Sequence, residues 1–209
     1  MLATKVIATG VTHLTDARYF AAWEVDYLTF ALGEDGLDWA TLNAMREWIA
    51  GPEIGVELPS VEGAAGTLGE HALNLLLLPS PAPAAAQKAV SEAGIRLFTR
   101  VPVAGYQSAE DIRELVEDVT GTVILDFESG GITWNDLVGG APFGPSALRE
   151  LLALRPTYLQ IALGAADPKQ LAVDFPIAGF AVRGSSEEKV GYKSFDDLDP
   201  LFEGLEVFD

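Results

Sequence analysis

Lys5-Val-Ile-Ala-Thr-Gly-Val-Thr-His-Leu-Thr-Asp-Ala17 joins an apolar run, a glycine and a polar helix start in one short stretch. The apolar run 6–8 predicts a buried strand, and Gly10 allows a tight turn directly after it. Thr12 or Thr15 can accept backbone N–H groups at the start of the following helix. The stretch therefore predicts one complete strand–turn–helix unit near the start of the chain.

The same unit recurs along the whole sequence. Ser108, Asp167 and Ser194 are predicted N-caps of three of the later helices. Because the strands are apolar throughout instead of alternating, they favour a closed parallel barrel in one domain, residues 1–209, over a doubly wound open sheet. The further runs that predict strands cover residues 26–32, 54–58, 73–78, 95–101, 122–126, 158–162 and 179–182.

The charge balance narrows the classes of partner. With 13 basic and 31 acidic residues, the net charge is −18. That charge argues against nucleic acid and against anionic membrane surfaces as partners. The chain has no cysteine and two histidines, His13 and His71, whose spacing matches no ligand motif. We therefore expect no metal site and no other cofactor.

The ends and hydropathy of the chain indicate no targeting or membrane segment. No basic segment followed by an apolar core opens the sequence, and the longest uncharged run, 72–87, is interrupted by prolines. The expected location is the cytoplasm. Both a monomer and a homodimer are compatible with the sequence.

Three segments resemble the phosphoribosylanthranilate isomerase family. The segment 8–17 is similar to that family's first strand and turn, which typically read Lys-Ile-Cys-Gly-Ile-Thr followed by Asp-Ala. Val123-Ile-Leu-Asp126 is similar to the sixth strand with its terminal aspartate, and Val190-Gly-Tyr-Lys-Ser194 is similar to the Pro-Gly-x-Lys-Asp segment after the eighth strand. The resemblance implies a (βα)8 TIM barrel of the ribulose-phosphate-binding type.

The resemblance also implies a chemistry, the Amadori-type isomerisation of a phosphoribosyl amine in tryptophan biosynthesis. In that family a cysteine on the first strand is the general base and the aspartate of the sixth strand is the general acid. Asp126 matches the acid, whereas Thr9 stands at the cysteine position, and a threonine hydroxyl is not a base without an activating partner. The family's arginine after the second strand is also missing from 33–37. We therefore expect the parental isomerase activity to be weak or absent.

Polar residues and glycines at the predicted strand ends are the candidate site. Asp126 is either an acid, or a helix cap or the ion-pair partner of Arg100. Arg100 is itself a candidate for substrate or phosphate binding. Gly164, Arg183 and Gly184 are candidates for holding a phosphate, because glycines let backbone N–H groups approach an anion and arginine adds a forked donor. We expect all of these, together with Thr9, to surround one mouth of the barrel.

Two further carboxylates fall near strand ends. Glu57 lies near the end of the third predicted strand and Glu128 just after the sixth, and for both we expect solvated loop side chains.

Two functions remain open from the sequence. One is an intramolecular oxidoreductase of the phosphoribosylanthranilate isomerase type. The other is a non-catalytic barrel that binds a small phosphorylated metabolite or a protein partner.

Overall fold

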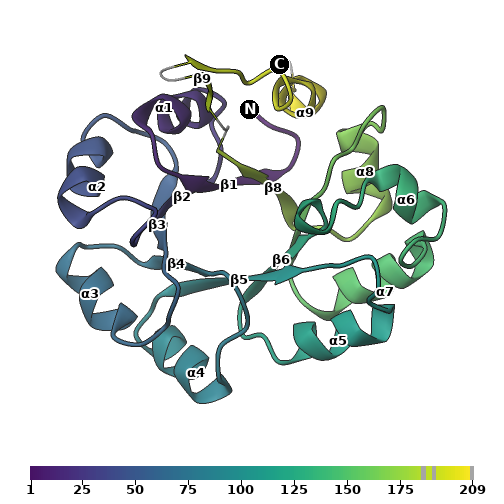
Figure 1. Cartoon of the computed structure of the whole chain (residues 1–209), viewed down its shortest axis with the longest axis horizontal. Coiled ribbons are helices and arrows are strands. Elements are labelled where there is room, and N and C mark those ends of the chain that lie inside the picture. Colours follow the sequence, from purple (N-terminus) through teal and green to yellow (C-terminus); the bar gives the residue numbers. More distant parts are fainter. Residues whose placement is uncertain (185–186, 190–191, 208–209) are drawn as a thin grey trace.

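The computed structural model describes residues 1–184, 187–189 and 192–207. Their eight long strands form a closed parallel barrel in the order β1 to β8, and helices surround it (Figure 1). This confirms the predicted (βα)8 fold. The strands are β1 (Lys5–Val11), β2 (Tyr27–Ala31), β3 (Glu53–Glu57), β4 (Leu75–Leu78), β5 (Arg96–Pro102), β6 (Thr122–Asp126), β7 (Thr157–Gln160) and β8 (Gly179–Arg183).

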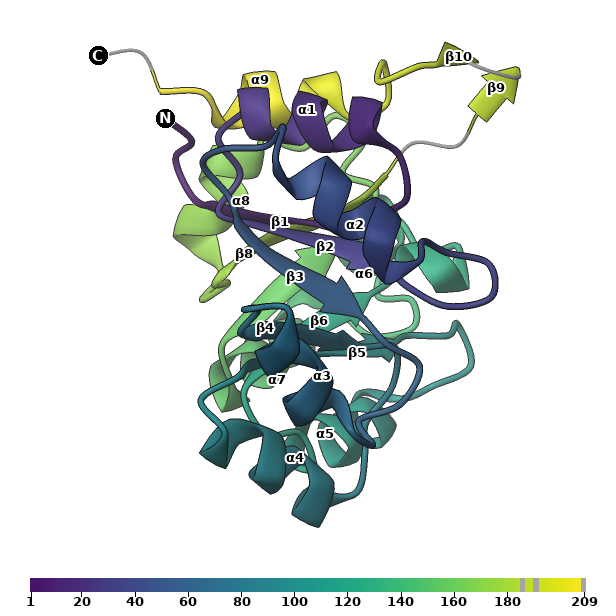
Figure 2. The same cartoon turned by 90° about the vertical axis from the view of Figure 1, so that its left-hand side faces the viewer.

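The helices follow the strands in turn, with two additions. A 3-10 turn, η1 (Glu128–Gly130), and a short helix, α6 (Trp134–Val138), precede α7, and a small hairpin of β9 (Glu187–Lys189) and β10 (Tyr192–Lys193) follows β8 (Figure 2). The other helices are α1 (Leu14–Ala22), α2 (Trp39–Arg46), α3 (Ala64–Glu70), α4 (Ala84–Glu92), α5 (Ala109–Glu117), α7 (Pro145–Leu154), α8 (Pro168–Asp174) and α9 (Asp199–Leu205).

The predicted cap at Thr12 or Thr15 is wrong, because the N-cap of α1 is His13 and no side chain caps the helix there. Two of the three predicted caps of the later helices are present. Ser108 forms a capping box with Asp111, and the Asp167 carboxylate accepts backbone N–H groups of α8. The third prediction is wrong, because α9 begins at Asp199 with Pro200 in its first turn, and Ser194 instead accepts the backbone N–H of Asp196.

The interior of the barrel has its own hydrophobic cluster, separate from the layer between strands and helices. Phe98 is its centre, with ring centroids 5.3 Å from Tyr27 and 5.6 Å from Tyr158. Gly55 is needed in β3, since an added Cβ would lie 2.5 Å from a side-chain atom of Leu75. The buried members of the cluster are Ile7, Tyr27, Leu75, Leu77, Phe98, Ile124, Tyr158 and Ala181.

The first and last helices pack side by side, as Figures 1 and 2 both show. The Tyr19 ring of α1 stacks on Phe195 at a centroid distance of 3.9 Å, and its hydroxyl donates to Asp199 at 2.5 Å. Burial and the neighbouring Asp199 carboxylate raise the pKa of Tyr19, so the hydroxyl remains a donor. These contacts hold Phe195 and the start of α9 against α1.

We predict that Phe98→Ala lowers the free energy of unfolding by about 3–5 kcal/mol, because the cavity left inside a closed barrel cannot collapse. Urea denaturation followed by circular dichroism measures the change. Tyr106→Ala is the matched control, since Tyr106 is 90% exposed and its loss is expected to cost no more than about 0.5 kcal/mol. Equal effects of the two variants would contradict this account of the core.

Candidate functional site

A polar layer lies above the interior cluster, at the carboxyl end of the barrel. Successive inward-facing residues of a strand are two positions apart, so the residue two after each interior position also faces the axis. In the fold this is the end at which barrel sites are found. The polar residues at these positions are Thr9, Thr29, Glu57, Arg100, Asp126, Gln160 and Arg183.

Arg100 lies among the other members of this layer and is only 6% exposed. Its Nη2 donates to the Thr9 hydroxyl at 2.9 Å, its Nη1 lies 3.4 Å from Glu57 Oε2, and its Nε lies 3.7 Å from Asp126 Oδ2. One guanidinium thus joins β5 to β1, β3 and β6.

Glu57 is a member of this network and not the solvated loop residue expected from the sequence. Its side chain is 15% exposed, and its Oε1 accepts the Thr29 hydroxyl at 2.9 Å and the backbone N–H of Gly10. The expectation failed because Glu57 is the last residue of β3 and faces inward, two positions after Gly55. The alternation along 53–57 was the signal that could have identified it.

Asp126 is fully buried and surrounded by donors. It accepts the backbone N–H of Ser129 at 2.9 Å, the Ser129 hydroxyl at 2.5 Å and Arg183 Nη2 at 3.4 Å. The ion pair with Arg100, one of the roles considered from the sequence, is present. In this geometry the Asp126 carboxylate forms ion pairs with both Arg100 and Arg183.

Thr9 is held in the wall of the mouth. Its hydroxyl donates to the Val182 carbonyl at 3.1 Å and accepts from Arg100, and the residue has no exposed surface. A hydroxyl acts as a base or nucleophile only beside a group that takes its proton. The partners of Thr9 are a carbonyl and a guanidinium, so the arrangement positions the strands and does not activate the oxygen.

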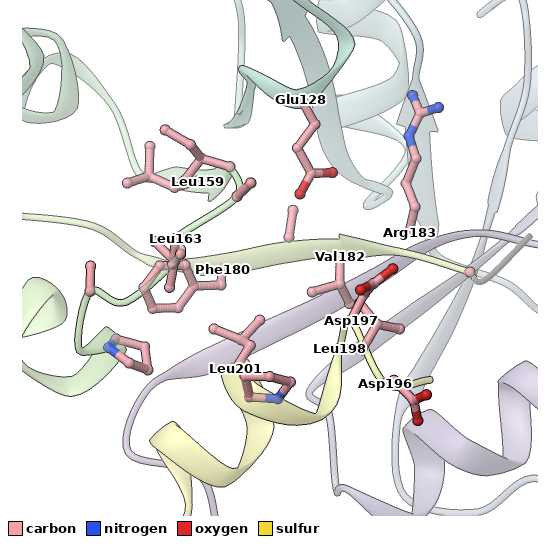
Figure 3. Close-up of a pocket in the computed structure, with 18 of the residues that line it drawn as sticks. Glu128, Leu159, Leu163, Phe180, Val182, Arg183, Asp196, Asp197, Leu198 and Leu201 are labelled. Atoms are coloured by element: carbon pink, nitrogen blue, oxygen red, sulfur yellow. The ribbon is translucent and has the colours of Figure 1, made fainter. Parts of the chain in front are cut away.

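A cavity of about 610 Å³ opens beside this network, where β7 and β8 diverge. The two strands pair only at Tyr158↔Gly179 and Leu159↔Phe180, whereas β1 and β8 pair at five positions. Figure 3 shows the cavity between these strands and the segment leading into α9. Glu128, Gly164, Arg183 and Gly184 are among its lining residues, whereas Thr9, Arg100 and Asp126 are not.

Two charged side chains at the cavity also contact the polar layer. Glu128 Oε2 accepts from Gln160 Nε2 at 3.1 Å, and Arg183, whose side chain is half exposed, contacts Asp126. Partial desolvation raises the pKa of Glu128 above its ordinary value despite the Gln160 hydrogen bond, and the nearby Asp126 carboxylate adds to the rise.

The two predicted phosphate-binding glycines both line the cavity but differ in their surroundings. Gly164 has a φ of +59° in the turn after β7. The backbone N–H of Gly184 already donates to the Thr9 carbonyl at 2.9 Å, and an added Cβ there would lie 3.0 Å from Asp16 Oδ2. In the segment compared with the family after the eighth strand, Val190 and Gly191 lie outside the described residues.

The described residues contain no group of three or more histidine, cysteine, aspartate or glutamate side chains arranged to hold a metal ion. Among the helices in the same part of the chain, none is long and apolar enough to cross a bilayer.

The fold is similar to several solved barrels. No sequence model of a protein family matches the chain, and no curated protein matches it. The phosphoribosylanthranilate isomerase of Thermus thermophilus is 22% identical, with a TM-score of 0.68 over 97% of this chain and 98% of that one. The corresponding Thermotoga maritima enzyme is 17% identical at the same TM-score and the same coverages. The resemblance to these isomerases is thereby confirmed for the fold.

A second kind of barrel is also similar. The 2-keto-3-deoxy-6-phosphogluconate aldolase of Zymomonas mobilis, solved with 3-phosphoglycerate, is 15% identical. Its TM-score is 0.58, and the match covers 99% of this chain and 93% of that one.

We predict that Arg100→Met lowers the free energy of unfolding by about 3–5 kcal/mol, because it leaves the buried Glu57 and Asp126 without their shared cation. Adding Glu57→Gln should recover part of the loss, which urea denaturation measures. Arg113→Met is the control, since it removes only partly exposed ion pairs with Glu110 and Glu150, with an expected cost below about 1 kcal/mol. A loss for Arg100→Met no larger than this would contradict the proposed importance of the buried pair.

Proposed function

We propose that this chain is a barrel that binds a small phosphorylated metabolite in the β7–β8 cavity and does not carry out the isomerisation of the phosphoribosylanthranilate isomerases. The observation that carries the proposal is the position of Arg100. Its guanidinium is buried at the carboxyl end of the barrel, where Glu57, Thr9 and Asp126 hold it. Because the carboxylates at this end of the barrel are engaged in ion pairs, they offer neither a free general base nor an accessible general acid.

The phosphate part of the proposal rests on the place and chemistry of the cavity. Barrels of this kind commonly hold phosphate in the loops after the seventh and eighth strands, where Gly164 and Arg183 line the cavity. A half-exposed guanidinium can contact Asp126 and still present N–H donors to a ligand. Two kinds of similar barrel are named for phosphorylated compounds, which supports the same class of ligand here.

We expect purified protein to lack measurable phosphoribosylanthranilate isomerase activity and to fail to restore growth of a tryptophan auxotroph without that enzyme. Loss of a general base alone typically costs about 10²- to 10⁴-fold in rate. Thr9→Cys should restore little, because Arg100 still contacts residue 9. Efficient turnover in a direct fluorescence assay, with a known isomerase as the positive control, would refute the non-isomerising barrel.

We expect phosphate or ribose 5-phosphate to bind at millimolar concentration, with binding weakened by Arg183→Ala and retained in Asp126→Asn. At physiological salt, charges more than about 8 Å from the ligand are largely screened. The affinity for phosphate therefore depends on the nearby N–H donors more than on the net charge of −18. Isothermal titration calorimetry measures the affinities. Binding indifferent to Arg183→Ala, or no binding at millimolar ligand, would rule out this phosphate site.

A further inference from the structure

Glu128 and Arg183 border the same cavity from neighbouring parts of the barrel. Arg183 is the last residue of β8, Glu128 follows β6 in η1, and both side chains lie in the upper part of the close-up in Figure 3. The ion pair that Arg183 makes within the described residues is with Asp126, at 3.4 Å, and not with Glu128. A phosphate held by Arg183 would therefore lie beside the Glu128 carboxylate without displacing a contact between the two side chains.

The Glu128 carboxylate has one oxygen held by the protein and one that is available. Its Oε2 accepts the side-chain amide of Gln160 at 3.1 Å, and Gln160 is fully buried. Its Oε1 accepts no hydrogen bond from the described residues. Figure 3 shows the carboxylate directed into the cavity. Glu128 therefore presents a positioned acceptor to a ligand at Arg183.

An acceptor that faces a bound anion requires a proton between the two. An ionised carboxylate has only acceptor oxygens, and so has a fully ionised phosphate, so the two groups repel each other when no proton lies between them. One proton converts this repulsion into a charge-assisted O–H···O hydrogen bond. A phosphate ester supplies that proton readily, because its second pKa is about 6. Sulfate has no proton to supply at neutral pH.

The surroundings of Glu128 favour its protonated form. Partial burial raises the pKa of Glu128 and the Asp126 carboxylate adds to the rise, whereas Gln160 and Arg183 oppose it. A phosphate bound to Arg183 would offset the positive charge that stabilises the ionised form of Glu128. The pKa of Glu128 would then rise further, and binding of the anion and binding of the proton would strengthen each other.

The other charged groups at the cavity act in the same direction. Asp196 and Asp197 line it from the segment before α9, and Arg183 is the one arginine or lysine among its described lining residues. A second full negative charge on the ligand is therefore disfavoured here, whereas a phosphate that keeps a proton carries only one.

We infer that the ligand of this cavity is a phosphate monoester that shares one proton with Glu128, and that Glu128 thereby selects phosphate monoesters against sulfate and phosphodiesters. The inference rests on the proposed function for the phosphate site at Arg183. A singly protonated phosphate donates to Glu128, or a protonated Glu128 donates to the phosphate. A sulfate or a phosphodiester has no proton to give, so Glu128 must itself be protonated, and the affinity is lower.

Inorganic phosphate and sulfate are matched probes, because both are tetrahedral oxyanions and only phosphate carries a proton at neutral pH. In calorimetric titrations at neutral pH we expect phosphate to bind about tenfold more tightly than sulfate, which corresponds to one charge-assisted hydrogen bond. Glu128→Gln should reduce this ratio to about one, because a glutamine amide donates to either anion. The variant also keeps an acceptor for the Gln160 amide.

Two further measurements separate a shared proton from a general effect of charge. Asp197→Asn removes a different carboxylate from the lining, so it should change both affinities alike and preserve the ratio. Ribose 5-phosphate, titrated above its second pKa of about 6 in buffers of different ionisation heat, should take up a proton on binding to the wild-type protein and not to Glu128→Gln. Circular dichroism of each variant confirms that it is folded before titration.

The outcomes distinguish this inference from the proposed function. Equal binding of phosphate and sulfate to the wild-type protein, or a preference that survives Glu128→Gln, overturns the shared proton and leaves the anion site at Arg183 intact. The same holds if proton uptake is absent from the wild-type protein or unchanged in Glu128→Gln, or if Asp197→Asn abolishes the preference equally. Absence of binding by both anions overturns the phosphate site and the inference with it.

Discussion

The buried contacts of Arg100 with Glu57 and Asp126 determine what the mouth of this barrel can do. A guanidinium that is 6% exposed requires carboxylates around it, because an unpaired buried charge is strongly unfavourable. Glu57 in turn holds Thr29 and the turn at Gly10, while Asp126 holds Ser129 and Arg183. The network therefore joins residues of six strands, β1, β2, β3, β5, β6 and β8, while the cavity lies at the seam between β7 and β8.

Much of the fold could be predicted from the sequence, because the strands are centred on apolar residues and these runs recur at the spacing of a parallel barrel. The elements that were missed have weaker signals. Helix α6 is five residues long within a glycine-rich segment, and its one marker was the capping box of Thr133 and Asp136. The prediction of Ser194 as the N-cap misplaced the start of α9, although proline in a first turn, here Pro200, is as good a signal.

Site residues could be predicted where the end of a strand was clear from the sequence. They could not be predicted where the partners of a side chain come from strands that are not neighbours. Asp126 ends an apolar run, and its alternative role beside Arg100 could be stated in advance because the two strands are neighbours. Glu57 could not be assigned in this way, since β3 and β5 are not adjacent and only barrel closure brings Glu57 to Arg100. The cavity depends on how far β7 and β8 remain paired, which no local pattern in the sequence records.

The short pairing of β7 with β8 also bears on the dynamics of the barrel. Backbone amides beyond the two paired positions are not tied into the ladder between these strands, so hydrogen exchange with solvent should be fast along this seam. A molecule that contacts both strands and α9 would bridge the gap and slow that exchange. Binding of a molecule in the cavity would then make the whole barrel more rigid without changing its architecture.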